Sequence, residues 1–136
     1  MKIFDCTTFF DEKMMMDIRF NVLNKFVYKF IVVESLFSHS GQKKKINFKK
    51  TDYPNFKDKI EHIVIEREPE NLIKENQIKK NELNKRLNSI KRIEQSYDYM
   101  SFGLKDAQDN DLIMLSDNDE IPNLEAINLN EIKNNF

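Results

Sequence analysis

The sequence predicts an α/β protein with a mostly parallel sheet flanked by helices, and two observations support this class. The first is an order of elements: a short apolar segment at residues 2–6, an amphipathic pattern over 12–25, and a β-branched, aromatic run over 27–33. Strand, helix and strand in this order form a βαβ crossover, whose two strands are parallel. The second is the continuous apolar run at residues 112–115, which is typical of a strand buried on both faces of a parallel sheet.

Length and composition indicate one globular domain, which we assign to residues 1–136. Hydrophobic residues make up 40% of the chain and include 11 phenylalanines, enough for a substantial core. Basic and acidic residues balance at 22 and 23, so no overall basic field favours nucleic acid as a partner. Gly41 and Gly103 are the only glycines, which excludes a G-x-G-x-x-G dinucleotide fingerprint and a Walker loop.

The few cysteines and histidines indicate the redox compartment and argue against a zinc site. The single Cys6 permits no internal disulfide, which favours a reducing compartment. His39 and His62 lack zinc-ligand spacing to Cys6, and no serine lies in a Gly-x-Ser-x-Gly elbow. Asp5 interrupts any signal peptide, and no apolar run approaches the about 20 residues that span a bilayer. We therefore expect a cytoplasmic protein, or one peripheral to a membrane, without a transmembrane segment.

The first elements are a strand at residues 2–6 and a helix over 12–25. Asp11 is predicted to be the N-cap of this helix, with Phe10 and Met15 forming a hydrophobic staple around it. The side chains that the helix is expected to bury recur at three- and four-residue spacing, and they are Met15, Ile18, Val22 and Phe26.

The second strand is expected to end at Glu34 and Ser35. Residues 36–58 are polar, turn-forming and basic, so they are predicted to be mostly loop. The lysines at 43–50 are interpreted as a solvated surface, and the alternative is a surface that attracts anions or an acidic partner. Residues 59–65 alternate weakly and are predicted to be the third strand.

Residues 75–104 predict a long helix or two consecutive helices, because no proline or glycine occurs before Gly103. Their apolar residues step by three and four, and they are Leu83, Leu87, Ile90, Ile93, Tyr97, Met100 and Leu104. We expect this stripe to pack on the sheet, and the alternative is a coiled-coil seam that binds another helix. A fourth strand at 112–115 and a last helix at 123–134 complete the prediction.

An acidic cluster directly follows the fourth strand. Asp117 and Asp119 are one residue apart, and Glu120 stands just before Ile121-Pro122. Proline cannot donate to a strand ladder, so the acids should lie at the carboxyl end of the strand, the edge where ligands bind in open α/β sheets. Two carboxylates at this spacing offer hard oxygen ligands for Mg²⁺ or Mn²⁺ that carries the phosphates of a substrate. The alternative is a solvated acidic turn.

Three parts of the chain carry a family resemblance. They are residues 1–12 (MKIFDCTTFFDE) continuing through 17–23, residues 30–35 (FIVVES) with Ser40-Gly41 and the lysine-rich stretch to Phe48, and residues 103–122, which end in SDNDEIP. These parts resemble glycosyltransferase family 17, the β-1,4-mannosyl-glycoprotein N-acetylglucosaminyltransferase family. The most specific string is the Ser-Asp-x-Asp-Glu-Ile-Pro sequence at 116–122.

The resemblance implies a fold, a reaction and a site. The fold would be a Rossmann-like, GT-A-type nucleotide-sugar-binding half, truncated after the Asp-x-Asp strand, with a partner chain supplying the acceptor half. The reaction would move N-acetylglucosamine or a related sugar from a UDP-sugar donor to a glycan acceptor. Asp117 and Asp119 would hold the divalent cation, Mn²⁺ or Mg²⁺, that binds the donor diphosphate. Glu34 and Ser35 would lie near the nucleoside, and no catalytic base is assigned.

Two departures from the family pattern leave alternatives open. Residues 96–98 (Ser-Tyr-Asp) stand where the family usually carries a Gln-Arg-Asn-like string, so a cation that would contact the diphosphate is missing unless Arg92 or Lys91 replaces it. The sequence also stops about a helix after the acidic motif, whereas GT-A transferases use further strands to hold the acceptor. Two alternatives to a complete transferase are a catalytically incomplete nucleotide-sugar-binding fragment and a protein-interaction module that uses the helix at 83–104.

Overall fold

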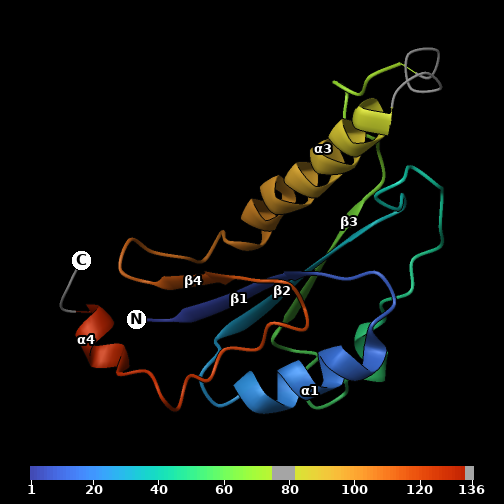
Figure 1. Cartoon of the computed structure of the whole chain (residues 1–136). Coiled ribbons are helices and arrows are strands. Elements are labelled where there is room, and N and C mark those ends of the chain that lie inside the picture. The colour runs from blue at the N-terminus through green and yellow to red at the C-terminus, as the bar shows by residue number, and fades with distance from the viewer. Residues whose placement is uncertain (75–81, 134–136) are drawn as a thin grey trace.

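The computed structural model describes residues 1–74 and 82–133 (Figure 1). Within these residues the strands are β1 (Ile3–Thr8), β2 (Lys29–Ser35), β3 (Ile60–Ile65) and β4 (Leu112–Leu115). The helices are α1 (Lys13–Leu23), α3 (Glu82–Met100) and α4 (Leu129–Lys133), and short 3₁₀ turns lie at η1 (Lys50–Asp52) and η2 (Ser101–Gly103). Residues 75–81, which were predicted to begin the long helix, lie outside the described residues.

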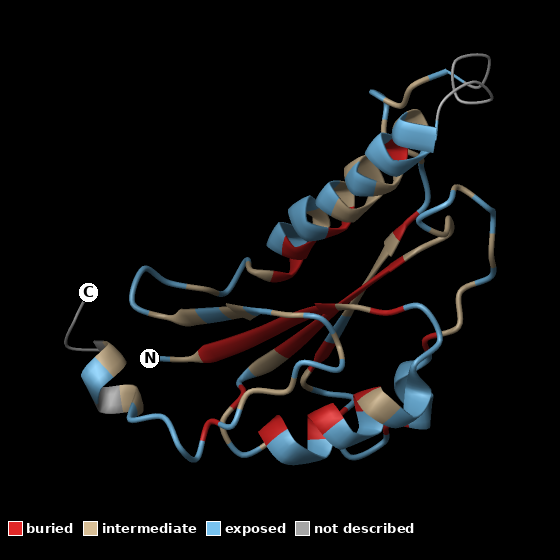
Figure 2. Ribbon diagram, viewed as in Figure 1, coloured by how far each residue is buried: buried red, intermediate tan, exposed pale blue. Residues whose placement is uncertain are grey.

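The strands form a parallel sheet in the order β3-β2-β1-β4, with α1 on one side and α3 on the other (Figure 1). The predicted α/β class with a parallel sheet flanked by helices is therefore confirmed. β1 lies between β2 and β4, and its Asp5 is in register with Phe30 of β2 and Met114 of β4. Figure 2 shows β1 and β2 as the most buried strands, which follows from their central position.

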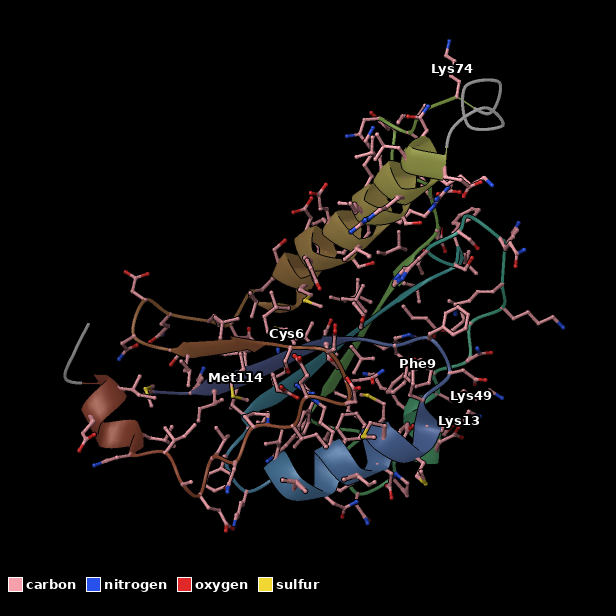
Figure 3. The ribbon with its side chains drawn as sticks, viewed as in Figure 1. Cys6, Phe9, Lys13, Lys49, Lys74 and Met114 are labelled. Carbon is pink, nitrogen blue, oxygen red and sulfur yellow. The ribbon has the colours of Figure 1, made fainter. Side chains whose placement is uncertain are left out.

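Side chains on the two faces of the sheet form two cores, and Figure 3 shows them around the ribbon. On the α1 side, the Phe20 ring centroid lies 4.7 Å from that of Phe30 and 5.0 Å from that of Tyr53. On the α3 side, the core is smaller and is made by Phe4, Cys6, Ile31, Val33, Ile65 and Met100. Burial there, with the charge of Asp5 nearby, raises the pKa of the Cys6 thiol to about 12, so this cysteine is a buried apolar residue and no nucleophile.

The buried face of α1 differs from the predicted one. The helix buries Met16, Arg19, Phe20 and Leu23. The predicted stripe is wrong, because Ile18 and Val22 are exposed. Both sets of residues repeat at three- and four-residue spacing, and the chosen face is the one whose arginine finds a buried partner, as described below.

The predicted N-cap of α1 is also wrong. Glu12 occupies the N-cap position, and no side chain caps the helix. Instead, Glu12 Oε2 accepts hydrogen bonds from the backbone N–H groups of Phe10 and Asp11, at 2.9 and 3.1 Å. The carboxylate therefore stabilises the turn between β1 and α1 rather than the first turn of the helix.

The long helix α3 packs on the sheet through few of its predicted apolar residues. Its buried residues are Asn88, Ser96 and Met100, and Leu104 beyond it also packs on the smaller core. The prediction that the whole apolar stripe covers the sheet is wrong, because Leu83, Leu87, Ile90 and Tyr97 are exposed. The chain lies tightly against the sheet at Gly103, where an added Cβ would lie 2.8 Å from two side-chain carbons of Ile31.

The fourth strand is an edge strand, and the prediction that it is buried on both faces is wrong. In the described part of the chain β4 pairs with β1 alone. Leu112 and Met114 pack against the core on the α1 side, whereas Ile113 and Leu115 are exposed. The last helix is shorter than predicted, since α4 begins at Leu129.

Candidate functional site

A cavity of about 470 Å³ lies at the carboxyl ends of β1, β2 and β4. It is lined by the end of β1 and the start of α1 (Thr8, Phe9, Phe10, Glu12, Met15), by the end of β2 and the following loop (Val33, Ser35, Phe37, His39, Lys44), by α3 (Arg92, Ser96), and by the loop after β4 (Asp117, Asn118, Asp119). The strands β2 and β3 extend the sheet to one side of β1 and β4 extends it to the other. Ligands of open α/β sheets bind at such switch points, in cavities of about 300–1,000 Å³.

The structure brings three of the four predicted site residues to this cavity. Asp117, Asp119 and Ser35 line it, although 81 or more residues separate the serine from the acids in sequence. Asp117 and Asp119 are exposed, and among the described residues neither carboxylate has a hydrogen bond or salt bridge. Both carboxylates are thus available to a ligand.

A buried ion pair lies beneath the acidic loop. Arg19 of α1 and Asp5 of β1 are 0% and 1% exposed. Arg19 Nε and Nη2 donate to the two carboxylate oxygens of Asp5 at 2.8 and 2.7 Å, which is the bidentate geometry that a guanidinium makes best. This pairing explains why α1 can bury a charged residue facing the sheet.

Arg19 also binds the backbone of the acidic loop. Its Nη1 donates to the carbonyl oxygens of Asp117, Asn118 and Glu120 at 2.8, 3.3 and 3.2 Å. Its Nη2 donates to Ser116 Oγ at 2.7 Å, and that hydroxyl donates to the Glu120 carbonyl at 3.0 Å. Because several carbonyls of the loop turn inward to one guanidinium, the loop is held from below while the acidic side chains remain at the cavity.

Sequence reasoning missed Asp5 and Arg19 as parts of the site. Both lie in the N-terminal segments that carry the family resemblance, which is the signal that could have found them. Their pairing spans 14 positions from a strand to a helix, so no local spacing rule reveals it.

The fourth predicted residue, Glu34, does not line the cavity. Its side chain is completely buried and faces the loop that follows β2. Its Oε1 accepts from Lys44 Nζ at 2.5 Å and from the Asn47 amide at 2.8 Å, and its Oε2 accepts from the Phe48 amide at 3.0 Å. His62 Nε2 lies 3.5 Å from Oε2. In this structure Glu34 therefore anchors the loop at 36–58.

The surroundings of Glu34 lower its pKa. Burial alone would raise the pKa, but the nearby His62, the Lys44 ammonium and the two backbone amides outweigh it and bring the pKa to about 2. Glu34 is thus ionised at neutral pH. Lys44 links this buried carboxylate to the site, because it also lines the cavity.

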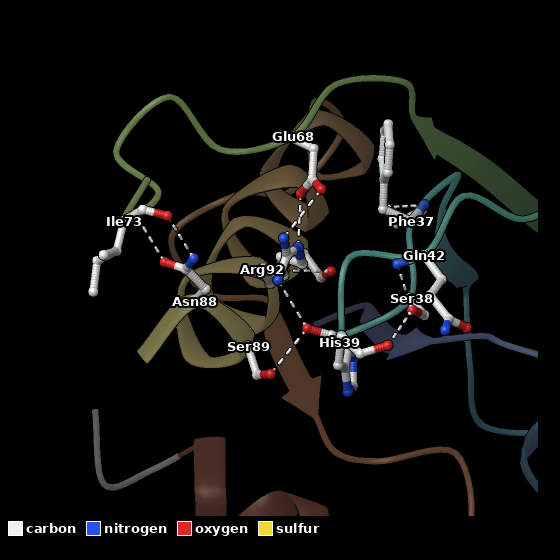
Figure 4. A network of polar contacts seen from close by, with 12 residues as sticks. Phe37, Ser38, His39, Gln42, Glu68, Ile73, Asn88, Ser89 and Arg92 are labelled. Atoms are coloured by element: carbon white, nitrogen blue, oxygen red, sulfur yellow. Dashed lines mark hydrogen bonds and ion pairs between the residues drawn. The ribbon is translucent and has the colours of Figure 1, made fainter. Parts of the chain in front are cut away.

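The helix α3 contributes a second cation, shown in Figure 4. Arg92 Nε and Nη2 donate to the two carboxylate oxygens of Glu68 at 2.7 and 3.1 Å, and Nη1 donates to the carbonyl of His39 at 3.0 Å. Of the two residues that could replace the cation missing at 96–98, Arg92 lines the cavity, whereas Lys91 Nζ donates to the Asn71 carbonyl.

The position of Arg92 depends on a glycine. Gly41 has a φ of 85°, a conformation that side chains rarely adopt. A Cβ at this position would lie 2.5 Å from Arg92 Nη2. Gly41 therefore permits both the turn of the loop and the close approach of the guanidinium.

The donor set at Asp117 and Asp119 suits a hard divalent cation carried by a substrate. The described residues contain no group of three or more histidine, cysteine or acidic side chains that could enclose a metal. Mg²⁺ is typically held by one or two carboxylates, with water and substrate phosphates completing its coordination. Two exposed, unpartnered carboxylates at a polar cavity fit that mode of binding.

Comparison with known proteins assigns the family. The model of glycosyltransferase family 17 matches residues 1–136, the whole chain. Searches of curated proteins and of solved structures found no match. No described helix combines the length and the apolar character needed to cross a bilayer. The family match agrees with the resemblance of the N-terminal and acidic segments, and the chain belongs to glycosyltransferase family 17.

Proposed function

We propose that the cavity binds the nucleotide-sugar donor of a glycosyl transfer, and that Asp117 and Asp119 hold the divalent cation that carries the donor diphosphate. The donor would be UDP-N-acetylglucosamine or a related UDP-sugar, the acceptor a glycan, and the fold of GT-A type. The observation that carries the proposal is the pair of unpartnered carboxylates at the switch point of the sheet.

The charged residues around the cavity support the proposal that a diphosphate binds between an acidic pair on one side and two cations on the other. The acidic pair faces the cavity from the loop after β4, and Arg92 and Lys44 face it from α3 and from the loop after β2. A cation on the acids would neutralise the charge that grows on the leaving nucleoside diphosphate. Arg92 is held by Glu68 and His39, so its guanidinium is already oriented when the donor arrives.

The remaining residues position these groups. Arg19 fixes the backbone of the acidic loop through its bonds to the Asp117 and Glu120 carbonyls. Ser35 lines the cavity and would lie near the nucleoside, and Glu34 acts indirectly by anchoring Lys44. We propose no catalytic base.

The proposal is tested by calorimetric titration of UDP into the chain with and without Mn²⁺. We expect binding that requires Mn²⁺ and that weakens at least about tenfold in an Asp117→Asn/Asp119→Asn variant, because both metal ligands lose their charge. Separate titrations of UDP-N-acetylglucosamine and of UDP-glucose into the chain then test which donor sugar it prefers.

Asp109→Asn is the matched control, since Asp109 is an exposed acid of the same region that does not line the cavity. Equal binding with and without Mn²⁺, or unchanged binding in the double variant, would contradict the proposal.

A further inference from the structure

The helix α3 buries Asn88, Ser96 and Met100 against its own protein and leaves several apolar residues exposed to solvent. Its apolar residues Leu87, Ile90 and Tyr97 are 38%, 40% and 41% exposed, and we call these three residues the outer stripe. Figure 2 shows most of the helix surface as exposed or intermediate. An apolar stripe of this kind on a surface helix is typical of an interaction site.

Specific polar contacts hold α3 in this orientation. Asn88 donates to the backbone carbonyl of Ile73 at 3.0 Å and accepts from its amide at 2.8 Å, and Arg92 pairs with Glu68 (Figure 4). Rotating the helix to bury the outer stripe would break these contacts and expose their partners. Within residues 1–74 and 82–133, these contacts keep Leu87, Ile90 and Tyr97 exposed to a partner outside the chain.

The spacing of the outer stripe fits a second helix. Its positions step by three and seven residues, as do the core positions of a helix pair. We propose that the outer stripe is a dimerisation surface that binds α3 of a second copy of this chain in an antiparallel direction.

Charge complementarity between two copies of α3 favours a second copy as the partner and an antiparallel direction of the two helices. Glu94 lies within the stripe between Ile90 and Tyr97, and Arg86 lies beside it in the N-terminal half of the helix. Both side chains are exposed, and no hydrogen bond or salt bridge joins either to another described residue. In an antiparallel pair the N-terminal half of each helix faces the C-terminal half of the other, so each Glu94 meets an Arg86 across the interface. A parallel pair would instead place the two Glu94 carboxylates together.

The dimer leaves the cavity open. Arg92 and Ser96, which line the cavity, lie on the side of α3 opposite the outer stripe, because an α-helix turns about 100° per residue. Self-association and donor binding are thus separate properties, and one can fail without the other.

Sedimentation velocity over a series of protein concentrations tests the proposal. The stripe is small, so we expect a weak, concentration-dependent dimer. Ile90→Asp should weaken it at least about tenfold, because it buries an unpaired charge in the seam. Val22→Asp on α1 changes a comparably exposed residue, at 46%, and should leave the dimer unchanged. A monomer at every concentration, or a dimer that Ile90→Asp does not weaken, would overturn the proposal.

Exchange of the two charges tests the direction. Arg86→Glu and Glu94→Arg should each weaken the dimer, since each places like charges across the antiparallel interface, and the double variant should restore it. A double variant no stronger than the single ones would overturn the antiparallel arrangement.

Discussion

The acids of β1, of β2 and of the loop after β4 fall into two groups that differ in what surrounds their carboxylates. Asp5 and Glu34 are buried, and each is bound by a cation, Arg19 in one case and Lys44 in the other. The acids after β4 are exposed and unpartnered among the described residues. A buried carboxylate is stable only with such partners, so the first group serves the structure. The second group is free to bind a ligand.

The two groups are nonetheless coupled through one side chain. Arg19 binds the buried Asp5 with one edge of its guanidinium and the acidic loop with the other. The buried Asp5 therefore helps to determine, through Arg19, where the exposed acids after β4 lie. Substitutions of the buried acids, of the exposed acids and of Arg19 should therefore have different effects on the free energy of unfolding and on ligand binding.

The largest effect is expected for Arg19→Ala. It leaves Asp5 as a buried, unpaired charge and removes the donor to the loop carbonyls, so it should lower the free energy of unfolding by about 3–5 kcal/mol. Urea denaturation measures this loss. An Asp5→Leu/Arg19→Met variant is the control: it should be more stable than Arg19→Ala, yet still lose Mn²⁺-dependent UDP binding. Stability equal to wild type in Arg19→Ala would show that the ion pair does not support the fold.

Glu34→Gln should have the next largest effect, and that effect should depend on pH. The pKa of Glu34 is lowered from 4.5 to about 2, so its ionised form stabilises the native state at pH values above 4.5. This stabilisation, about 3 kcal/mol, is lost as the pH falls from 4.5 towards 2. The difference in unfolding free energy between wild type and Glu34→Gln should therefore be large at pH 7 and small at pH 2. A difference that stays constant over this range would contradict the assigned role.

A smaller effect is expected for Gly41→Ala. The new methyl group needs an unfavourable backbone conformation and collides with Arg92 Nη2, which should cost about 1–2 kcal/mol and displace the guanidinium from the cavity. UDP affinity measured by calorimetry should fall severalfold. Gly103→Ala is the matched control, because its methyl group meets Ile31 away from the cavity and should lower stability without lowering affinity. Equal UDP affinity in the two variants would show that Arg92 does not contribute to UDP binding.

The sheet and the acidic edge could be predicted because strand composition and Pro122 are local signals. The helix faces could not. On α1, a second set of apolar residues repeats at the same spacing as Met16, Phe20 and Leu23. Arg19 determines which face of the helix is buried, but a charged residue is expected to face solvent. Only its bond to Asp5, on another element, reverses that interpretation.

On α3 the predicted apolar residues do lie along one side of the helix, but most of that side is exposed to solvent. Asn88 and Arg92 have partners at Ile73 and Glu68, in the connection after β3, and these polar contacts outweigh the apolar periodicity. The position of Glu34 at the end of β2 could be predicted, but the direction of its side chain could not, because the loop amides determine it.

The most direct test of the division between the two groups of acids is the stabilisation that UDP and Mn²⁺ confer in three proteins: wild type, Glu34→Gln and Asp117→Asn/Asp119→Asn. At a ligand concentration about 100 times Kd, a bound ligand adds about 2.7 kcal/mol to the unfolding free energy. We expect the full gain in wild type and a smaller but clear gain in Glu34→Gln, which starts less stable and no longer holds Lys44 at the cavity. The double variant should start as stable as wild type and gain nothing. Full stabilisation of the double variant by the ligand, or its loss in Glu34→Gln alone, would contradict the assignment of Asp117 and Asp119 as the binding acids.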